Sequence, residues 1–123
     1  MRRGTIGWID LTVSDAEQVR DFYQAVVGWT ASPVSMGEYE DYSMNAPDDG
    51  AAIAGVCHAL GENANLPSTW MVYIVVDDLE YSMQRCEELG GAVIVLPRQM
   101  GNARYCVIRD PSGAVCSLYQ PGE

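Results

Sequence analysis

The sequence predicts an α+β fold: two tandem β-α-β-β-β modules that form a curved mixed sheet around a shared cleft, with the helices outside. Two observations predict it. The chain repeats itself at a constant offset of 63 residues, for example from Asp15 to Asp78 and from Gly28 to Gly91. Each copy also runs from a strand-like apolar segment through an amphipathic helix pattern into several short strands. One small sheet with one helix cannot cover both of its faces, so we expect the two copies to join.

Length and charge limit the possible functions. With 123 residues, the chain is expected to form a single domain. Its net charge of −10 argues against nucleic acid and against an anionic membrane surface as partners, because both attract Lys and Arg. No apolar run approaches the roughly 20 residues of a membrane span. We therefore expect a cytoplasmic protein that binds neither nucleic acid nor membrane.

The first module is expected over about residues 5–58. Its first strand, Ile6–Val13, is rich in β-branched residues. Asp15 is a favourable helix N-cap, and Gln18 completes a capping-box pattern three residues later. The helix then places four apolar residues on one stripe: Val19, Phe22, Tyr23 and Val26. Gly28 supplies the helix stop, and three short strands follow it: Thr30–Pro33, Tyr39–Asn45 and Ala51–Cys57.

The second module is expected over about residues 70–121, after a polar linker at about 59–69. Asp78 repeats the helix cap that follows the strand Met71–Val76, and Gly90 and Gly91 repeat the stop. Three short strands again follow the helix: Ala92–Leu96, Arg104–Ile108 and Val115–Tyr119. The four cysteines form no CxxC pair and no zinc spacing, so we interpret them as small buried apolar residues.

Three stretches carry a family resemblance: "DLTVSDAEQVRDFYQAVVGW", "VVDDLEYSMQRCEELGGAVIVLP" and "RDPSGAVCSLYQP". In this order they resemble the vicinal oxygen chelate superfamily, which includes glyoxalase I, bleomycin-resistance proteins and extradiol dioxygenases. The resemblance covers nearly the whole chain. It implies the cleft between modules as the binding site, and it implies that homodimers are common.

The resemblance also implies where metal ligands stand in metal-dependent members. A His on the first strand of each module falls at Trp8 and Met71, each seven residues before the capping aspartate. The acid on the last strand falls at Ser117 and, at the same offset, Ala54. None of these is a usual ligand of a divalent ion. We therefore expect no metal and no other cofactor, and a divalent ion would need non-standard ligands.

Side-chain alternation along each strand predicts what lines the cleft. If Trp8 faces it, residues two apart face it as well, and the apolar set between them packs under the helices. The expected ligand-binding residues are Trp8, Asp10, Thr12, Ala54, Met71, Tyr73, Ser117 and Tyr119. An apolar, aromatic lining with few polar groups is typical of a small-molecule site.

Asp10 is the candidate catalytic residue, because a lone carboxylate among aromatic rings can have a raised pKa and serve as general acid or base. The alternative is that it is simply hydrated in an open cleft. His58 has no partner at a recognised spacing, which favours a strand-end role. Met36, Met44 and Met100 are interpreted as flexible gap-fillers.

Two functional hypotheses follow. The first is a metal-free binding protein, glyoxalase/bleomycin-resistance-like, that holds an aromatic or cationic small molecule in an apolar cleft. The second is an enzyme of the same superfamily, a lyase, isomerase or dioxygenase. It would use metal-free acid–base chemistry or relocated metal ligands: Asp10 and His58 with Glu38 or Glu40. A third possibility is one half of a larger assembly, such as a homodimer, that completes the cleft. The sequence leaves all three open.

Overall fold

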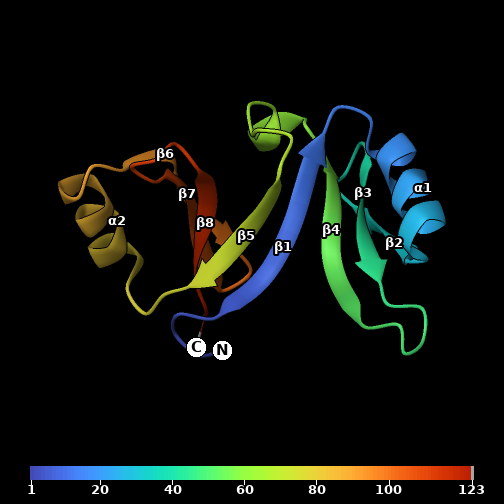
Figure 1. Cartoon of the computed structure of the whole chain (residues 1–123), viewed down its shortest axis with the longest axis horizontal. Helices are drawn as coiled ribbons and strands as arrows, with labels where there is room; N and C mark the ends of the chain where they lie inside the picture. The colour runs from blue at the N-terminus through green and yellow to red at the C-terminus, as the bar shows by residue number, and fades with distance from the viewer. Residues whose placement is uncertain (123) are drawn as a thin grey trace. The chain divides into compact units, whose positions relative to one another are not determined.

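The elements follow the predicted order. The computed structural model describes residues 1–122. In chain order they form β1 (Ile6–Val13), α1 (Ala16–Val27), β2 (Thr30–Ser35), β3 (Glu40–Asn45), β4 (Ala52–His58), the 3₁₀ turn η1 (Gly61–Asn63), β5 (Trp70–Val75), α2 (Leu79–Glu88), β6 (Ala92–Met100), β7 (Ala103–Arg109) and β8 (Val115–Gln120) (Figure 1). This order confirms the α+β class and the repeated β-α-β-β-β arrangement.

The chain divides into two compact units. The first unit is residues 9–70, and the second unit is residues 71–122 together with residues 1–8. The division falls inside β1, since the N-terminal segment pairs with the second unit. There the N–H of Gly4 donates to the carbonyl of Val75 at 2.7 Å, and the N–H of Val75 donates to the carbonyl of Thr5 at 2.8 Å. The expected single domain and its shared cleft remain predictions.

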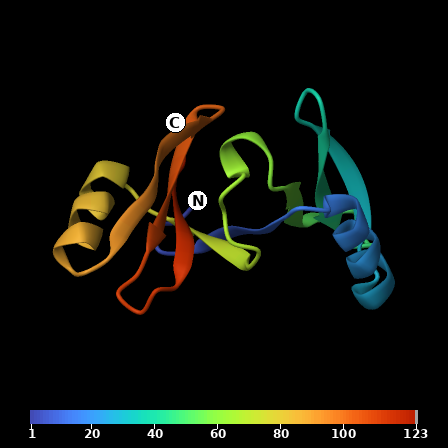
Figure 2. The ribbon, with the colours of Figure 1, turned by 90° about the horizontal axis from the view of Figure 1, so that it is seen from above.

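The first unit is a four-stranded sheet in the order β2-β3-β4-β1, in which β1 and β4 are parallel. Helix α1 lies against one face (Figure 2). The buried core beneath α1 is formed by Ala16, Tyr42, Met44, Ala54 and Val56. Ile9 and Val13 pack against this core, as the alternation along β1 predicts.

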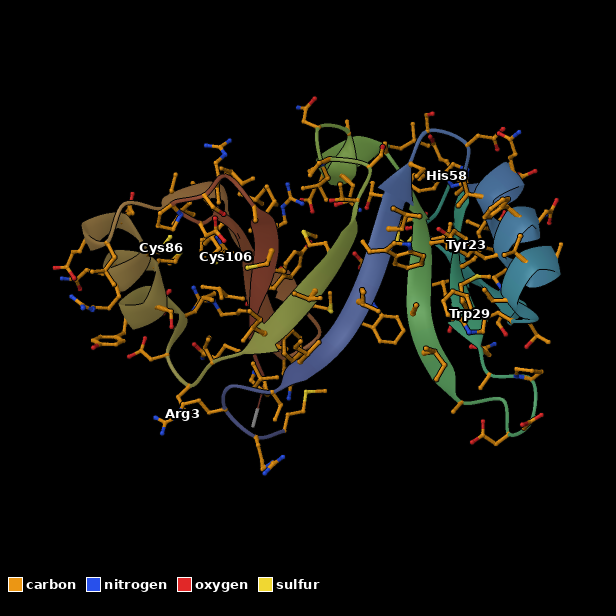
Figure 3. All side chains as sticks on the ribbon, viewed as in Figure 1. Arg3, Tyr23, Trp29, His58, Cys86 and Cys106 are labelled. Carbon is orange, nitrogen blue, oxygen red and sulfur yellow. The ribbon has the colours of Figure 1, made fainter. Side chains whose placement is uncertain are left out.

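An aromatic cluster closes one side of that core. The rings of Tyr23, Trp29 and Trp70 lie within 5.2–6.1 Å of one another, centroid to centroid. The indole Nε1–H of Trp70 donates to the hydroxyl of Tyr23 at 3.1 Å. Figure 3 shows Tyr23 and Trp29 on the strand-facing side of α1. Aromatic pairs in edge-to-face geometry stabilise a core beyond their buried area, so this cluster holds α1 on its sheet.

The second unit repeats the plan with the strand order β5-β8-β7-β6, in which β5 and β8 are parallel. The core under α2 contains Leu79, Cys106 and Leu118. Ile74 and Val76 pack against it, again as the alternation predicts. Figure 3 shows Cys86 of α2 on the side toward Cys106 of β7. Because Ile74 faces α2, its neighbour Tyr73 points to the opposite face of the sheet.

Both helices begin and end where the sequence predicts. The carboxylate of Asp15 accepts the N–H of Gln18 at 3.0 Å, and that of Asp78 accepts the N–H of Tyr81 at 3.1 Å. Gly28 follows α1 with φ of 79°, a conformation that side chains with a Cβ rarely adopt.

The predicted apolar stripe of α1 is only half buried. Val19 and Tyr23 pack on the core, whereas Phe22 and Val26 are 55% and 62% exposed. Residues three and four apart spread over a wide arc of the helix, and this sheet covers only the part of that arc centred on Ala16 and Tyr23.

The expected place of Ala54 on the cleft face is wrong. Ala54 is fully buried in the core beneath α1, opposite Met44. The cause is a bulge: Met44 pairs with Ala54 but Asn45 pairs with Ala52, so Ile53 is an extra residue in β4. One extra residue moves every later side chain of a strand to the other face. The counterpart of Ser117 is therefore Gly55, because Gly55 pairs with Asp10 as Ser117 pairs with Tyr73.

The four cysteines are free thiols, three of them partly buried and Cys106 fully buried. Their expected role as small apolar residues agrees with this burial. Separately, none of the helices in the described part of the chain is long and apolar enough to cross a membrane.

We predict that Asp15→Ala lowers the free energy of unfolding by about 1 kcal/mol, because the N–H of Gln18 in the first turn of α1 then loses its side-chain acceptor. Urea denaturation followed by far-ultraviolet circular dichroism measures the change. Asp48→Ala, in an exposed turn, is the matched control and should change stability by less than about 0.5 kcal/mol. Equal effects of the two substitutions would contradict the capping role.

Candidate functional site

A cavity of about 240 Å³ lies within the second unit. Its lining residues are almost entirely apolar or aromatic: Met1, Gly7, Trp8, Tyr73, Met100 and Tyr119. They come from the N-terminal segment with β1, from β5, from the end of β6, and from β8. Three of the eight expected ligand-binding residues therefore meet in one cavity, and their role in binding remains a prediction.

The strand register explains why the two tyrosines lie together. Tyr73 pairs with Ser117, and Val75 pairs with Tyr119, so Tyr73 and Tyr119 lie two positions apart on the face of the sheet away from α2. Tyr119 also pairs with Tyr105 of β7, whose ring lies 5.9 Å from that of Tyr73. Tyr73 is only 6% exposed, so its ring is held by its neighbours. The aromatic wall is thus rigid and built on strands.

The N-terminal segment forms the other wall. Its pairing with Val75 brings Gly7 so close that an added Cβ there would lie 3.1 Å from Cγ2 of Val75 and 3.3 Å from the sulfur of Met1. Arg3 (Figure 3) of the same segment forms an exposed ion pair with Asp77 at 3.2 Å. A larger residue at position 7 would therefore press against the side chains of Val75 and Met1 and so disturb this wall of the cavity.

Ser117 lies on the same face as the cavity but is fully buried, and its hydroxyl donates to the carbonyl of Cys106 at 2.7 Å. Met71 is 4% exposed. Neither residue is among those that line the described cavity. Ser117 thus joins β7 to β8 and holds the sheet beneath the aromatic residues.

Asp10 and Thr12 lie in the first unit and do not line this cavity. Thr12 is 4% exposed, and Asp10 is half-buried opposite Gly55. Burial raises the pKa of the Cys57 thiol, and the nearby carboxylates of Asp10 and Asp41 raise it further. The first unit therefore presents an acidic, polar group of side chains where the second unit presents aromatic rings.

His58 connects two strands of the first sheet. Its backbone N–H donates to Oδ1 of Asp41 at 2.8 Å, and its ring Nδ1 lies 2.8 Å from the carbonyl oxygen of Glu40 (labelled in Figure 3). Nδ1 is also 3.6 Å from Oδ1 of Asp41. These contacts fasten β3 to the end of β4. Among residues 1–122, no three His, Cys, Asp or Glu side chains are placed to hold a metal ion, so the relocated ligand set of Asp10, His58 and a glutamate is not assembled.

The residues present do not fit the metal that the fold family implies. The four corresponding positions hold Trp8, Met71, Ser117 and, after the correction for the bulge, Gly55. Trp and Gly offer no ligand atom in their side chains, and Ser117 already uses its hydroxyl on a backbone carbonyl. A divalent cation needs several carboxylate, imidazole or thiolate ligands that converge.

Three lining residues are not among the expected site residues. Met100, a predicted gap-filler, lies in the cavity wall and is 47% exposed. The other two are Met1 and Gly7. The available signal was Gly7 itself, since a glycine inside a strand often marks a close approach of another part of the chain.

The comparison with known families gives a clear match. A profile of the Glyoxalase/Bleomycin resistance protein/Dioxygenase superfamily matches residues 5–118. An anthracycline biosynthesis protein of Streptomyces peucetius is 32% identical over 135 residues, which cover 97% of this chain and 48% of the relative. The chain thus spans about half the length of the curated relatives it matches.

Solved structures share the fold. A methylmalonyl-CoA epimerase of Mycobacterium tuberculosis is similar with a TM-score of 0.62 and 16% identity, over 98% of this chain and 89% of that chain. A variant of the Streptomyces coelicolor methylmalonyl-CoA epimerase has a TM-score of 0.63 at 16% identity, over 99% of this chain and all of that chain. At such low identity the likeness establishes the fold alone.

The raised thiol pKa values lead to a prediction about pH. Burial is the largest cause at all four cysteines, and it raises the pKa of the Cys106 thiol to about 11. Above about pH 8.5 the unfolded chain loses thiol protons that the folded chain keeps. The free energy of unfolding should therefore fall as the pH rises through and above that value. Urea midpoints at several pH values, compared with those of Cys57→Ala, measure the effect. If the free energy of unfolding falls with pH as steeply in Cys57→Ala as in the unaltered chain, Cys57 does not contribute to the effect.

Proposed function

Because the chain belongs to the glyoxalase/bleomycin resistance protein/dioxygenase superfamily, we propose that it binds a neutral aromatic small molecule, without a metal ion, in the cavity of its second unit. The observation that carries the proposal is the lining itself: the rings of Trp8, Tyr73 and Tyr119 with the thioether of Met100. Flat rings and a polarisable sulfur favour a planar apolar guest.

The size of the cavity limits the ligand. An engineered apolar cavity of about 150 Å³ is enough for benzene, and drug-sized pockets start at roughly 300 Å³. A cavity of about 240 Å³ therefore suits a ligand of one or two rings, or one end of a larger aromatic molecule. The relative named for anthracycline biosynthesis supports an aromatic guest, since anthracyclines are polycyclic aromatic compounds.

The charge of the ligand also follows from the lining. None of the described residues around the cavity is a carboxylate, and Asp10 lies in the other unit. A cation would find only ring faces, which attract it weakly unless it is fully desolvated. The negative net charge disfavours an anion. A neutral ligand is therefore preferred over the cationic one that the sequence left open.

The enzyme hypothesis has less support. Its metal-free form assigns acid–base chemistry to Asp10, which does not line the cavity. Its metal-dependent form requires Asp10, His58 and a glutamate to converge on one ion, and among the described residues they do not. A general acid or base must lie within hydrogen-bond reach of the reacting group. Binding without chemistry is thus the function that these residues favour.

We predict that 2-naphthol binds and quenches Trp8 fluorescence, and that Met100→Gln weakens this binding about tenfold, because a polar amide replaces an apolar wall. Met36→Gln is the matched control, since Met36 and Met100 are 46% and 47% exposed and only Met100 lines the cavity. Titration calorimetry measures both variants.

Ligand charge gives a second arm of this experiment. The uncharged naphthol should bind more tightly than 2-(aminomethyl)naphthalene, and naphthalene-2-carboxylate should bind least. If the carboxylate binds best, or if Met36→Gln weakens binding as much as Met100→Gln, the assignment of this cavity is wrong.

We also predict that the chain retains less than about 0.1 metal ion per molecule after incubation with Zn²⁺, Ni²⁺, Mn²⁺ or Fe²⁺ and desalting, because the implied positions offer no carboxylate, imidazole or thiolate. Elemental analysis of the desalted protein measures the retained metal. Retention of about one ion per chain would contradict the metal-free proposal. Loss of that ion in Asp10→Asn or His58→Ala would then locate the site.

A further inference from the structure

A second concavity lies on the opposite face of the second unit. It is a groove of about 500 Å³ between α2 and β6. Three glutamates and a glutamine of α2 line one side, and apolar side chains line the rest: Glu80, Gln84, Glu87, Glu88, Met83, Val93 and Leu96. The sheet separates this groove from the aromatic cavity, because α2 covers the face that bears Cys106 and Leu118.

The strand that borders the groove is shaped by two irregularities. Along β6, Val93 pairs with Ile108 and Val95 with Val107, and the next pair is Arg98 with Tyr105. Leu96 and Pro97 therefore stand opposite a single residue of β7. Bulges of this kind re-aim side chains. Leu96 is 76% exposed and extends the apolar lining that Met83 and Val93 provide.

The helix contributes charge on one stripe. Glu80, Gln84, Glu87 and Glu88 are spaced so that they share a face of α2. Two of the glutamates form ion pairs. Nη1 of Arg104 lies 3.0 Å from Oε1 of Glu80, and Nη1 of Arg85 lies 2.9 Å from Oε1 of Glu88. Glu87 forms no ion pair with any residue in the described part of the chain. The groove thus combines an apolar floor with an acidic rim that keeps one unneutralised carboxylate.

We infer that this groove docks a basic amphipathic helix of a partner protein, with apolar residues against Leu96 and Met83 and with Lys or Arg toward Glu87. We choose a basic partner because its positive charge complements the acidic side chains of the groove. A second copy of this chain carries the same net charge of −10, and nucleic acids and anionic membranes are also negative. A helix is favoured over an added strand, because Pro97 and the two bulges interrupt the hydrogen-bonding edge of β6.

The test uses the full chain and a fluorescently labelled 14-residue peptide, LKKLLKLLKKLLKL, in an anisotropy titration at low salt. A second peptide with Glu in place of Lys is the charge control. The basic peptide should bind, the acidic one should not, and affinity should fall several-fold between about 50 and 200 mM salt.

Matched variants locate the binding on the chain. Leu96→Ser should weaken peptide binding about fivefold or more, and Glu87→Gln by about two- to threefold. Val34→Ser and Glu38→Gln, exposed positions of the first unit, should leave it unchanged. The affinity of Leu96→Ser for 2-naphthol should equal that of the unaltered chain, which separates this inference from the function of the cavity.

Three results would overturn the inference. One is equal binding of the acidic and basic peptides. Another is equal weakening by Leu96→Ser and Val34→Ser, which would indicate attraction to the whole negative surface. The third is full displacement of the peptide by spermine at micromolar concentration. Spermine has positive charge but no apolar side chains, so it should compete poorly for a groove that also binds apolar residues.

Discussion

The alternation of side chains along β5 and β8 is the constraint on which the rest of the second unit depends. Ile74 and Leu118 point toward α2 and hold it, and Tyr73 and Tyr119 therefore point away and are available to form a cavity wall. The same four strands thus support two surfaces of opposite character: an aromatic cavity on one face and an acid-rimmed groove under the helix on the other. Neither surface can shift along a strand by one residue without exchanging its side chains for those of the core.

The repeat explains how the two units came to differ while keeping one plan. Position for position, Asp10 of the first unit corresponds to Tyr73 of the second, and Gly55 corresponds to Ser117. Both units keep the aspartate cap, the glycine stop and the parallel pairing of first and last strands. The cores under the two helices differ as well, since Tyr23 and Trp29 of the first unit correspond at the same offset to Cys86 and Ala92 of the second.

Much of the fold could be predicted from sequence, since the signals are local. The capping aspartates Asp15 and Asp78 and the stop at Gly28 lie where the residue types indicate. The face of Ala54 could not be predicted, because the extra residue Ile53 changes no hydropathy pattern and is visible only in the pairing with β3. The place of Met100 and Met1 in the cavity could not be predicted for a related reason. They reach the cavity from β6 and from the segment before β1, and periodicity does not indicate which distant segments meet.

The position of Met1 has a practical consequence for anyone who handles this protein. Its side chain forms part of the cavity wall, and the segment behind it is fixed by the bond from Gly4 to Val75 and by the ion pair of Arg3. A purification tag or fusion partner joined ahead of Met1 would therefore start at a wall of the cavity in which we propose that the ligand binds.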